Sequence, residues 1–361
     1  MSLQPEILPL VAARAAHLRH GINLSHWFSQ VYQAAGYTPK HFDSYLNAQD
    51  IALIKTMGFD HVRFPIAAEP ILNPANPGQL PPEYMARLDR EVQTMLDQDL
   101  AVIIDIHPGT PFKKALAASD ASVDAFVSFW SALAGNFSKF DADRLFFEVL
   151  NEPEIQNPKR WNEIQNKAAQ AIRRAAPSHT IILGGDEWSA LPMLELLELP
   201  EDRNIICNFH LYDPLIFTHQ GAKWAPPWAM FCKGMTYPSN PAFIQNFLKT
   251  VTDPDAIREI NEYKQLNWNL ERYEAMIAKA AAWGRAHGVA LTCNEFGVYK
   301  VFAPRSCRLD WIRDISGALE RQKIGWTMWD YAGDFEVVNK RDGKRMPDTA
   351  VLAALGLKVA G

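Results

Sequence analysis

Short apolar or β-branched runs alternate with segments of helical periodicity along almost the whole chain. The run at 101–106 is apolar on both faces, which is typical of a strand buried in a parallel sheet. Consecutive parallel strands need a crossover connection, usually a helix, so the alternation predicts an α/β protein. Strand-like runs occur at 21–24, 61–64, 101–106, 145–150, 180–183, 205–211, 289–294 and 325–329. Helical segments are predicted at 44–57, 83–98, 121–137, 161–175, 190–197, 270–287, 309–321 and 349–355.

Eight strand–helix units favour a closed (β/α)8 TIM barrel over an open doubly wound sheet. Such a barrel needs about 250 residues and tolerates insertions. The 361 residues are therefore expected to form a single catalytic barrel over 1–361, with a long insertion rich in proline and aromatic residues at about 212–265. No glycine-rich phosphate loop follows the first strand, which argues against a dinucleotide-binding fold.

The composition argues against several kinds of partner and site. The chain has 36 basic and 41 acidic residues and no long basic run, so nucleic acid is not an expected partner. No apolar stretch approaches the roughly 18 residues of a membrane span. The four cysteines include no Cys-x-x-Cys pair, which argues against a structural zinc site and favours free thiols.

Polar, ionisable and aromatic residues collect where the predicted strands end. In a barrel, the carboxyl ends of the strands and the loops after them build the active site. Buried charges are costly unless they are paired, so a rim that gathers them is a candidate site. Any one of these residues could be structural, but their recurrence at successive strand ends favours function. They are Asn23, His26, Trp27, Arg63, Asp105, His107, Asn151, Glu152, His210, Tyr212, Asn294, Glu295, Trp326, Trp329 and Asp330.

Two of the strand-end residues are carboxylates on separate strands, Glu152 and Glu295. Cleavage of a glycoside needs such a pair, because one group protonates the leaving oxygen while the other acts at the anomeric carbon. The two roles require different pKa values and hence different surroundings. Arg63 is a possible charge partner for Glu295 and would keep it ionised, as a nucleophile requires.

The strand-end motifs resemble those of glycoside hydrolase family 5, whose cellulase-like members are (β/α)8 retaining hydrolases. The matching segments follow the family's order and cover residues 21–330. They are Gly-Ile-Asn-Leu at 21–24, His-Val-Arg-Phe-Pro at 61–65, Asp-Ile-His at 105–107, Glu-Val-Leu-Asn-Glu-Pro at 148–153, His-Leu-Tyr at 210–212, Asn-Glu-Phe-Gly at 294–297 and Trp-Thr-Met-Trp at 326–329.

The resemblance implies a role for each matched residue near the cleaved bond. Glu152 would be the general acid/base and Glu295 the nucleophile. Arg63 would hydrogen-bond the nucleophile, while His210 and Tyr212 would tune the acid/base and the nucleophile respectively. A retaining mechanism would place the two carboxyl groups about 5 Å apart.

Other matched residues would bind the sugar. Asn151 would contact the 2-hydroxyl, His107 would bind further hydroxyls, and Trp329 would form the platform under the ring. We also expect His26 and Trp27 to contact substrate. Their segment, Ser-His-Trp-Phe at 25–28, departs from the Gly-Gly-Trp of many relatives.

The aromatic residues of the insertion allow two interpretations. They could pack on one another as a small core beneath a long loop. They could instead form a wall of sugar-stacking subsites, or a cap that blocks one end of the cleft. The residues concerned are Phe217, Trp224, Trp228, Phe231 and Tyr237.

The favoured function is retaining hydrolysis of a β-glucan by an endo-β-1,4-glucanase without metal or cofactor. A β-mannanase, an exo-β-1,3-glucanase and a glycosidase acting on a glycoconjugate are alternatives within the family. Two other classes stay open. One is a carbohydrate-binding barrel without catalysis, and the other is a metal-dependent hydrolase using Asp105, His107, His210 and Glu295.

The substrate class also suggests where the protein acts and with what. We expect a polysaccharide or oligosaccharide substrate and a monomeric enzyme. Because such polymers lie outside the cell, a secreted or periplasmic mature domain lacking its signal peptide is favoured, with the cytoplasm as the alternative.

Overall fold

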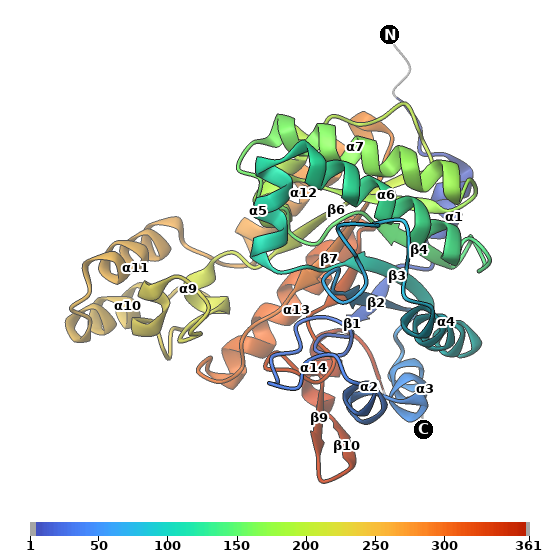
Figure 1. The fold of residues 1–361 in the computed structure, drawn as a ribbon. Helices are drawn as coiled ribbons and strands as arrows, with labels where there is room; N and C mark the ends of the chain where they lie inside the picture. The colour runs from blue at the N-terminus through green and yellow to red at the C-terminus, as the bar shows by residue number, and fades with distance from the viewer. Residues whose placement is uncertain (1–4, 359–361) are drawn as a thin grey trace.

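The computed structural model describes residues 5–358 and confirms the predicted (β/α)8 barrel (Figure 1). Eight parallel strands follow one another in chain order, and the sheet closes because β1 pairs with both β2 and β8. Each predicted strand run overlaps one of them. The strands are β1 (His20–Asn23), β2 (His61–Ile66), β3 (Ala101–Ile106), β4 (Leu145–Glu148), β5 (Thr180–Gly184), β6 (Ile205–Leu211), β7 (Ala290–Phe296) and β8 (Gly325–Met328).

Helices surround the barrel, and two predicted helical segments differ from the structure. Segment 44–57 is divided, because Asn47 caps a new helix and forms a reciprocal capping box with Asp50. Segment 190–197 is a 3-10 helix, η1 (Leu191–Leu196), preceded by the short α8 (Asp186–Ser189). The remaining helices around the barrel are α1 (Pro9–Ala15), α2 (Pro39–Tyr45), α3 (Ala48–Thr56), α4 (Pro82–Asp97), α5 (Thr110–Ala118), α6 (Asp120–Phe137), α7 (Pro158–Ala175), α12 (Leu270–His287), α13 (Arg305–Arg321) and α14 (Thr349–Ala354).

Buried tryptophans on the surrounding helices fix the ends of two strands. Trp130 of α6 donates its indole N–H to the carbonyl of Val149 at 3.0 Å, just beyond β4. Trp161 of α7 donates to the carbonyl of Gly184 at 2.8 Å, at the end of β5. Each ring fills core volume and donates a hydrogen bond to a backbone carbonyl at the end of a strand. The loops that follow β4 and β5 therefore start from fixed positions.

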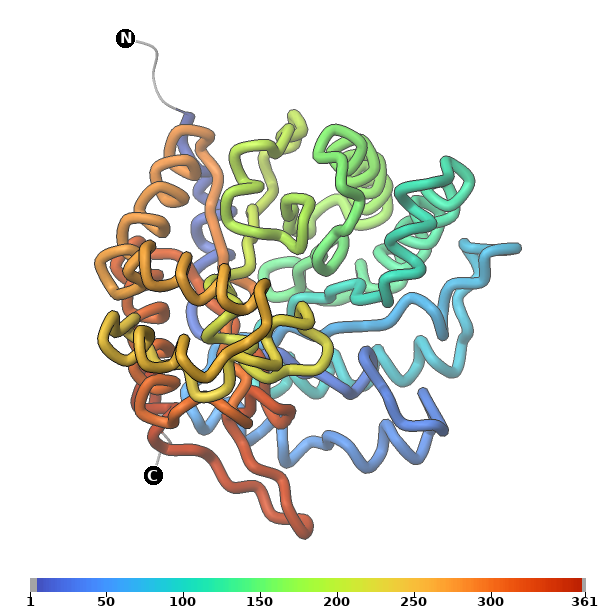
Figure 2. Tube along the Cα trace, turned by 90° about the vertical axis from the view of Figure 1, so that its left-hand side faces the viewer, coloured from blue at the N-terminus to red at the C-terminus, as the bar shows by residue number. Residues whose placement is uncertain are grey.

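The segment after β6 forms a lobe that projects from one side of the barrel in Figure 1 and lies in front of it in Figure 2. The interpretation as a small core is confirmed for part of the lobe, and stacking of its exposed rings on sugar stays a prediction. Phe217 and Tyr237 are buried and Trp228 is half-buried, as in a small core, whereas Trp224 and Phe231 are exposed. The lobe contains α9 (Leu215–Thr218), η2 (Pro227–Phe231), α10 (Pro241–Phe247), η3 (Leu248–Thr250) and α11 (Pro254–Leu266).

Two further observations concern the whole described chain. Across residues 5–358, no helix combines the length and apolar character needed to cross a bilayer. All four cysteines are free thiols, and Cys207, Cys232 and Cys293 are buried.

A β-hairpin near the end of the chain, which the sequence analysis did not predict, is anchored on a buried carboxylate of α3. The hairpin pairs β9 (Val338–Arg341) with β10 (Lys344–Pro347). Arg345 places Nε 2.7 Å from Asp50 Oδ1 and Nη2 3.0 Å from Oδ2, and Lys340 Nζ lies 3.1 Å from Oδ1. The Tyr331 hydroxyl donates to Asp50 at 2.8 Å. Burial works to raise the pKa of Asp50, but the donors outweigh it and hold the pKa below its ordinary value.

We expect Asp50→Asn to lower the free energy of unfolding by about 2–3 kcal/mol, because it leaves the buried Tyr331 hydroxyl and the half-buried Arg345 and Lys340 without their anion. Since the folded pKa of Asp50 is lowered, its contribution is present above the unfolded value of about 3.9 and is lost as the pH falls through the folded value. Urea unfolding at pH 7 and pH 3 measures both effects. Asp342→Asn, on the exposed tip of the hairpin, is the control. Equal stability of the two variants at pH 7 would contradict the prediction.

Candidate active site

Arg63 is a buried cation at the centre of the strand-end residues. Its side chain comes from β2, and Nε and Nη2 donate to the two oxygens of Glu148 at 2.9 and 2.8 Å. Nη2 also lies 2.9 Å from Asp105 Oδ2, and Nη1 lies 2.5 Å from Glu295 Oε1. Burial alone would lower the pKa of Arg63, but the three carboxylates outweigh it and hold the pKa well above its ordinary value. A fixed positive charge therefore faces Glu295.

Glu295 is held at both of its carboxylate oxygens. Oε1 accepts from Arg63, and Oε2 accepts from the Tyr212 hydroxyl at 2.9 Å. Burial and the charge of Glu295 raise the pKa of Tyr212 well above its ordinary value, so the hydroxyl keeps its proton and remains a donor. Two donors fix the orientation of the carboxyl group, which a nucleophile requires.

Glu152 has different surroundings. It follows β4 with φ of 45°, a left-handed conformation that costs a non-glycine residue about 1–3 kcal/mol and is typical of functional sites. Its side chain is 24% exposed, and Oε1 lies 3.1 Å from His210 Nδ1. Burial raises the pKa of Glu152, which favours the protonated form that a general acid needs. Burial also lowers the pKa of His210 to about 4, so this ring is neutral near pH 7 and can donate from Nδ1.

The spacing of the two glutamates selects between two kinds of glycoside hydrolysis. One oxygen of Glu152, one oxygen of Glu295 and a ring nitrogen of His210 all lie within 4.8 Å of one another. Retaining hydrolases hold their carboxyl groups about 5–5.5 Å apart, whereas inverting ones need about 6.5–9.5 Å to admit a water molecule. The arrangement can therefore support a covalent sugar intermediate on Glu295.

The ligand set of the metal-dependent alternative does not assemble. Asp105 is engaged by Arg63 and by His107, whose Nδ1 lies 3.0 Å from Asp105 Oδ2. His210 and Glu295 instead face Glu152. Glu152 and Glu295 each already have a protein hydrogen-bond partner, so we interpret them as acid/base and nucleophile rather than as ligands.

His107, Asn151 and Trp329, which were predicted to bind the sugar, lie close together in the structure. The His107 ring stacks beside Trp329, with centroids 5.7 Å apart and planes 23° from parallel. Burial lowers the pKa of His107 to about 3, so the ring is neutral, and its contact with Asp105 places the proton on Nδ1. Asn151 Nδ2 lies 3.1 Å from His107 Nε2, and Asn151 Oδ1 accepts from Arg63 at 2.9 Å. One hydrogen-bond network therefore orients these polar groups at the cleft.

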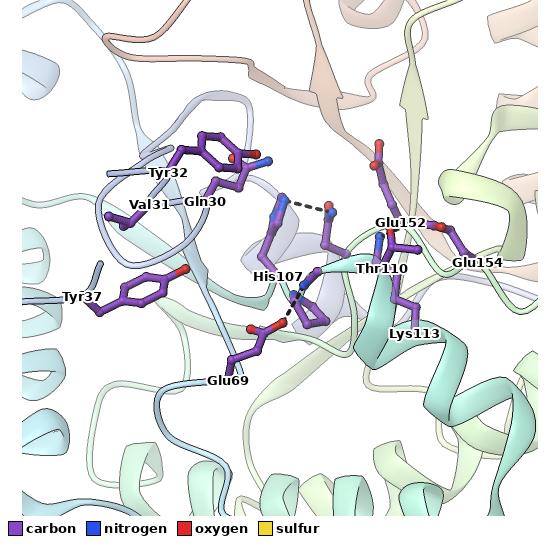
Figure 3. A pocket seen from close by; sticks show the side chains of 13 residues that line it. Gln30, Val31, Tyr32, Tyr37, Glu69, His107, Thr110, Lys113, Glu152 and Glu154 are labelled. Carbon is purple, nitrogen blue, oxygen red and sulfur yellow. Dashed lines mark hydrogen bonds and ion pairs between the residues drawn. The ribbon is translucent and has the colours of Figure 1, made fainter. Parts of the chain in front are cut away.

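Two cavities meet at Glu152, one of about 960 Å³ and one of about 450 Å³. Figure 3 shows the side chains that line the smaller one. Because the cavities share several lining residues, they form one continuous cleft on both sides of Glu152. The shared residues are Gln30, Tyr32, His107 and Glu152.

The cleft also contains exposed aromatic residues, of which sequence reasoning missed Trp188 and Tyr32. Trp188 lines the larger cavity and is 53% exposed, in a run of three left-handed residues with φ of 51°, 60° and 53° at Glu187, Trp188 and Ser189. Tyr32, at the junction of the cavities, is 80% exposed. Trp224 of the lobe lines the larger cavity as well. Flat apolar rings held in solvent can stack on sugar faces.

The assignment of Trp27 to substrate binding is corrected by the structure. Trp27 is 1% exposed, and its indole N–H donates to the carbonyl of Phe42 at 2.9 Å, within the core. Its neighbour His26 does line the larger cavity, with Nε2 3.9 Å from Asp330 Oδ2. His26 has a left-handed backbone with a φ of 58°. Its side chain faces the cavity, whereas that of the next residue, Trp27, faces the core.

Comparison with known proteins adds an independent line of evidence. Residues 26–334 match the family model described as Cellulase (glycosyl hydrolase family 5). The chain is 31% identical over 327 residues to Endoglucanase C of Acetivibrio thermocellus, covering 89% of this chain and 93% of that protein. It is 28% identical to Cellodextrinase A of Ruminococcus flavefaciens, covering 84% and 82%. The structure of endoglucanase Cel5A from Thermotoga maritima is similar in fold, with a TM-score of 0.79, 24% identity and coverage of 96% and 99%.

We expect Glu295→Gln to reduce kcat on every β-glycoside by about 10⁴-fold or more, because no nucleophile remains. Glu152→Ala should lose about 10²–10⁴-fold on a sugar leaving group but much less on an activated aryl glycoside, which needs little acid assistance. Steady-state kinetics on both substrates measure this difference. Glu163→Gln, on the outer surface of α7, is the control. Near-wild-type turnover by Glu295→Gln would refute the nucleophile assignment.

Proposed function

Because the chain belongs to glycosyl hydrolase family 5, we propose that this glycoside hydrolase is a retaining endo-β-1,4-glucanase. The observation that carries the proposal is the pair of differently held carboxylates within 4.8 Å, Glu295 between two donors and Glu152 on a strained turn facing the cleft. The names of the relatives, an endoglucanase and a cellodextrinase, support a β-1,4-glucan as the substrate.

In the first step, Glu295 attacks the anomeric carbon of the bound sugar while Glu152 protonates the glycosidic oxygen. Arg63 and Tyr212 orient the attacking carboxylate, since they hold both of its oxygens. The bond to the leaving sugar breaks and a covalent bond to Glu295 forms. His210 donates to the carboxylate that Glu152 becomes when it loses its proton.

In the second step, the ionised Glu152 takes a proton from a water molecule, whose oxygen attacks the anomeric carbon and releases Glu295. Two inversions at one carbon retain the β-configuration. The proton that left Glu152 in the first step is thereby restored from water. Glu152 therefore acts first as an acid and then as a base, for which partial exposure to the cleft is suitable.

The shape of the cleft supports internal cleavage of a polymer. The acid/base lies where the two cavities meet, so a chain has room on both sides of the cleaved bond. Exposed rings are available along the larger cavity at Trp188 and Trp224, and at the junction at Tyr32. An enzyme acting on chain ends would need one side closed.

A panel of soluble β-1,4-glucan, β-1,4-mannan and β-1,3-glucan tests the proposal. We expect the highest kcat/KM on β-1,4-glucan, with viscosity falling early relative to the release of reducing ends. Proton NMR of the first products should show the β-anomer. A preference for mannan or β-1,3-glucan, or release of short units from chain ends, would replace the proposed specificity with one of the family alternatives.

We expect Trp224→Ala to raise KM for a long β-glucan about fivefold, because the loss of one stacking platform costs about 1 kcal/mol. A short aryl glycoside, which does not reach the lobe, should show little change. The matched control is Phe231→Ala, which removes an exposed ring of the same lobe that lines neither cavity. Equal effects of the two substitutions would contradict a subsite at Trp224.

A further inference from the structure

An ion pair lies beside the acid/base and has no role in the mechanism above. Lys113, in the first turn of α5, places Nζ 3.0 Å from Glu154 Oε1. The same oxygen accepts from the Thr110 hydroxyl at 3.3 Å. Glu154 lies two residues beyond Glu152, and all four residues line the smaller cavity, where Figure 3 shows Lys113 and Glu154 close to Glu152. The pair therefore joins α5 to the turn that carries the acid/base.

Burying this ion pair costs desolvation free energy that a purely structural contact between the two segments would not require. The Lys113 side chain is only 5% exposed and that of Glu154 only 18%. Removing two charges from water often costs more than their attraction returns, and an uncharged contact could join the same two segments. A charge placed here has an effect that an uncharged contact lacks, because it acts on the protonation of a nearby carboxyl group.

Lys113 is also unusual among the groups around the cleft. Among the described residues that line the two cavities, it is the only lysine or arginine. The acidic residues lining the same space are Glu69, Glu152, Glu154, Glu187, Asp213, Glu295, Asp330 and Asp334. The ring of His26 faces Asp330 at 3.9 Å rather than Glu152.

Other titratable groups that face Glu152 are already committed to partners. Arg63 on β2 contacts three carboxylates, and one of them is Asp105 on β3, whose pKa burial raises to about 7. Tyr212 keeps its proton and donates to Glu295. His107 on β3 and His210 on β6 are neutral, since burial lowers their pKa values to about 3 and about 4. Glu295 on β7 is held by Arg63 and Tyr212 at its two oxygens. Lys113 and Glu154 are therefore the charged residues near Glu152 that can be substituted without disturbing the hydrogen bonds of the other site residues.

We propose that Lys113 and Glu154 are positioning residues that set the acid strength of Glu152, the cation favouring its charged form and the anion opposing it. The proposal rests on the proposed hydrolase mechanism, in which Glu152 must change protonation twice in each cycle. Burial raises the pKa of Glu152, Lys113 is the strongest of the charges that lower it, and Glu154 raises it. With the pair intact, the two opposing charges partly cancel.

The test compares pH profiles of kcat/KM for Lys113→Met, Glu154→Gln and the double variant. The substrate is a β-glycoside with a sugar leaving group, because its cleavage needs the protonated acid. Lys113→Met leaves the anion alone, so the alkaline limb should move up by roughly half a unit to one unit. Glu154→Gln leaves the cation alone, so the limb should move down by a similar amount. The double variant should return close to the wild-type limb.

Opposite shifts distinguish an electrostatic role from a structural one. If both single variants lose activity while their alkaline limbs stay in place, the pair only joins two segments and the proposal is overturned. Lys113→Arg, which keeps the charge, should keep the limb, and Lys114→Met controls for substitution on the exposed side of α5. If Lys113→Met does not fold, the direction of the shift in Glu154→Gln alone decides.

The proposed function can fail separately. If the wild-type chain cleaves another β-glycoside but not β-1,4-glucan, the substrate assignment fails and the pH profiles are measured on the glycoside that it does cleave. If Glu152→Ala retains wild-type activity on a sugar leaving group, the acid/base assignment fails, whatever the profiles of the other variants.

Discussion

The site depends on one buried guanidinium. Arg63 is fully enclosed by the barrel, and an arginine there is tolerable only because Asp105, Glu148 and Glu295 surround it. These partners come from three further strands, β3, β4 and β7, so the ion network can form only when the strands hold one relative register. The planar guanidinium of Arg63 also restricts where each carboxylate oxygen can lie. The position of Glu295 is thus fixed by the same ion pairs that compensate the buried charge of Arg63.

The fold was largely predictable from the sequence because the alternation of apolar runs and helix-period segments is visible along the chain. Eight buried runs such as 101–106 and eight intervening helical segments are sufficient to indicate a closed barrel, since strand burial on both faces is visible in composition alone. The lobe was visible only as an excess of proline and aromatic residues. Its helix α11 (Pro254–Leu266) was missed although Asp253 caps its first turn, and the β9–β10 hairpin was missed because contacts with the distant Asp50 hold it in place.

The site was predictable where strand ends carry charged or aromatic residues, and less so elsewhere. Glu148 could have been recognised as an acidic residue ending an apolar strand, because such a residue needs a buried partner. Trp27 was misassigned, since nothing local reveals that consecutive residues at His26 and Trp27 face the cleft and the core respectively. The exposure of Trp188 depends on three successive left-handed residues. The residue types at these positions do not predict that conformation, so Trp188 was missed.

The anchoring of the β9–β10 hairpin has a consequence for the order of assembly. The hydrogen bond between Arg345 and Asp50 joins residues 295 positions apart, and the neighbouring pairing of β1 with β8 closes the barrel across a similar distance. During synthesis, α3 emerges early and retains an unneutralised carboxylate until nearly the whole chain has been made. The first strand–helix units therefore cannot reach their full native stability until the last segment has been synthesised and the barrel has closed.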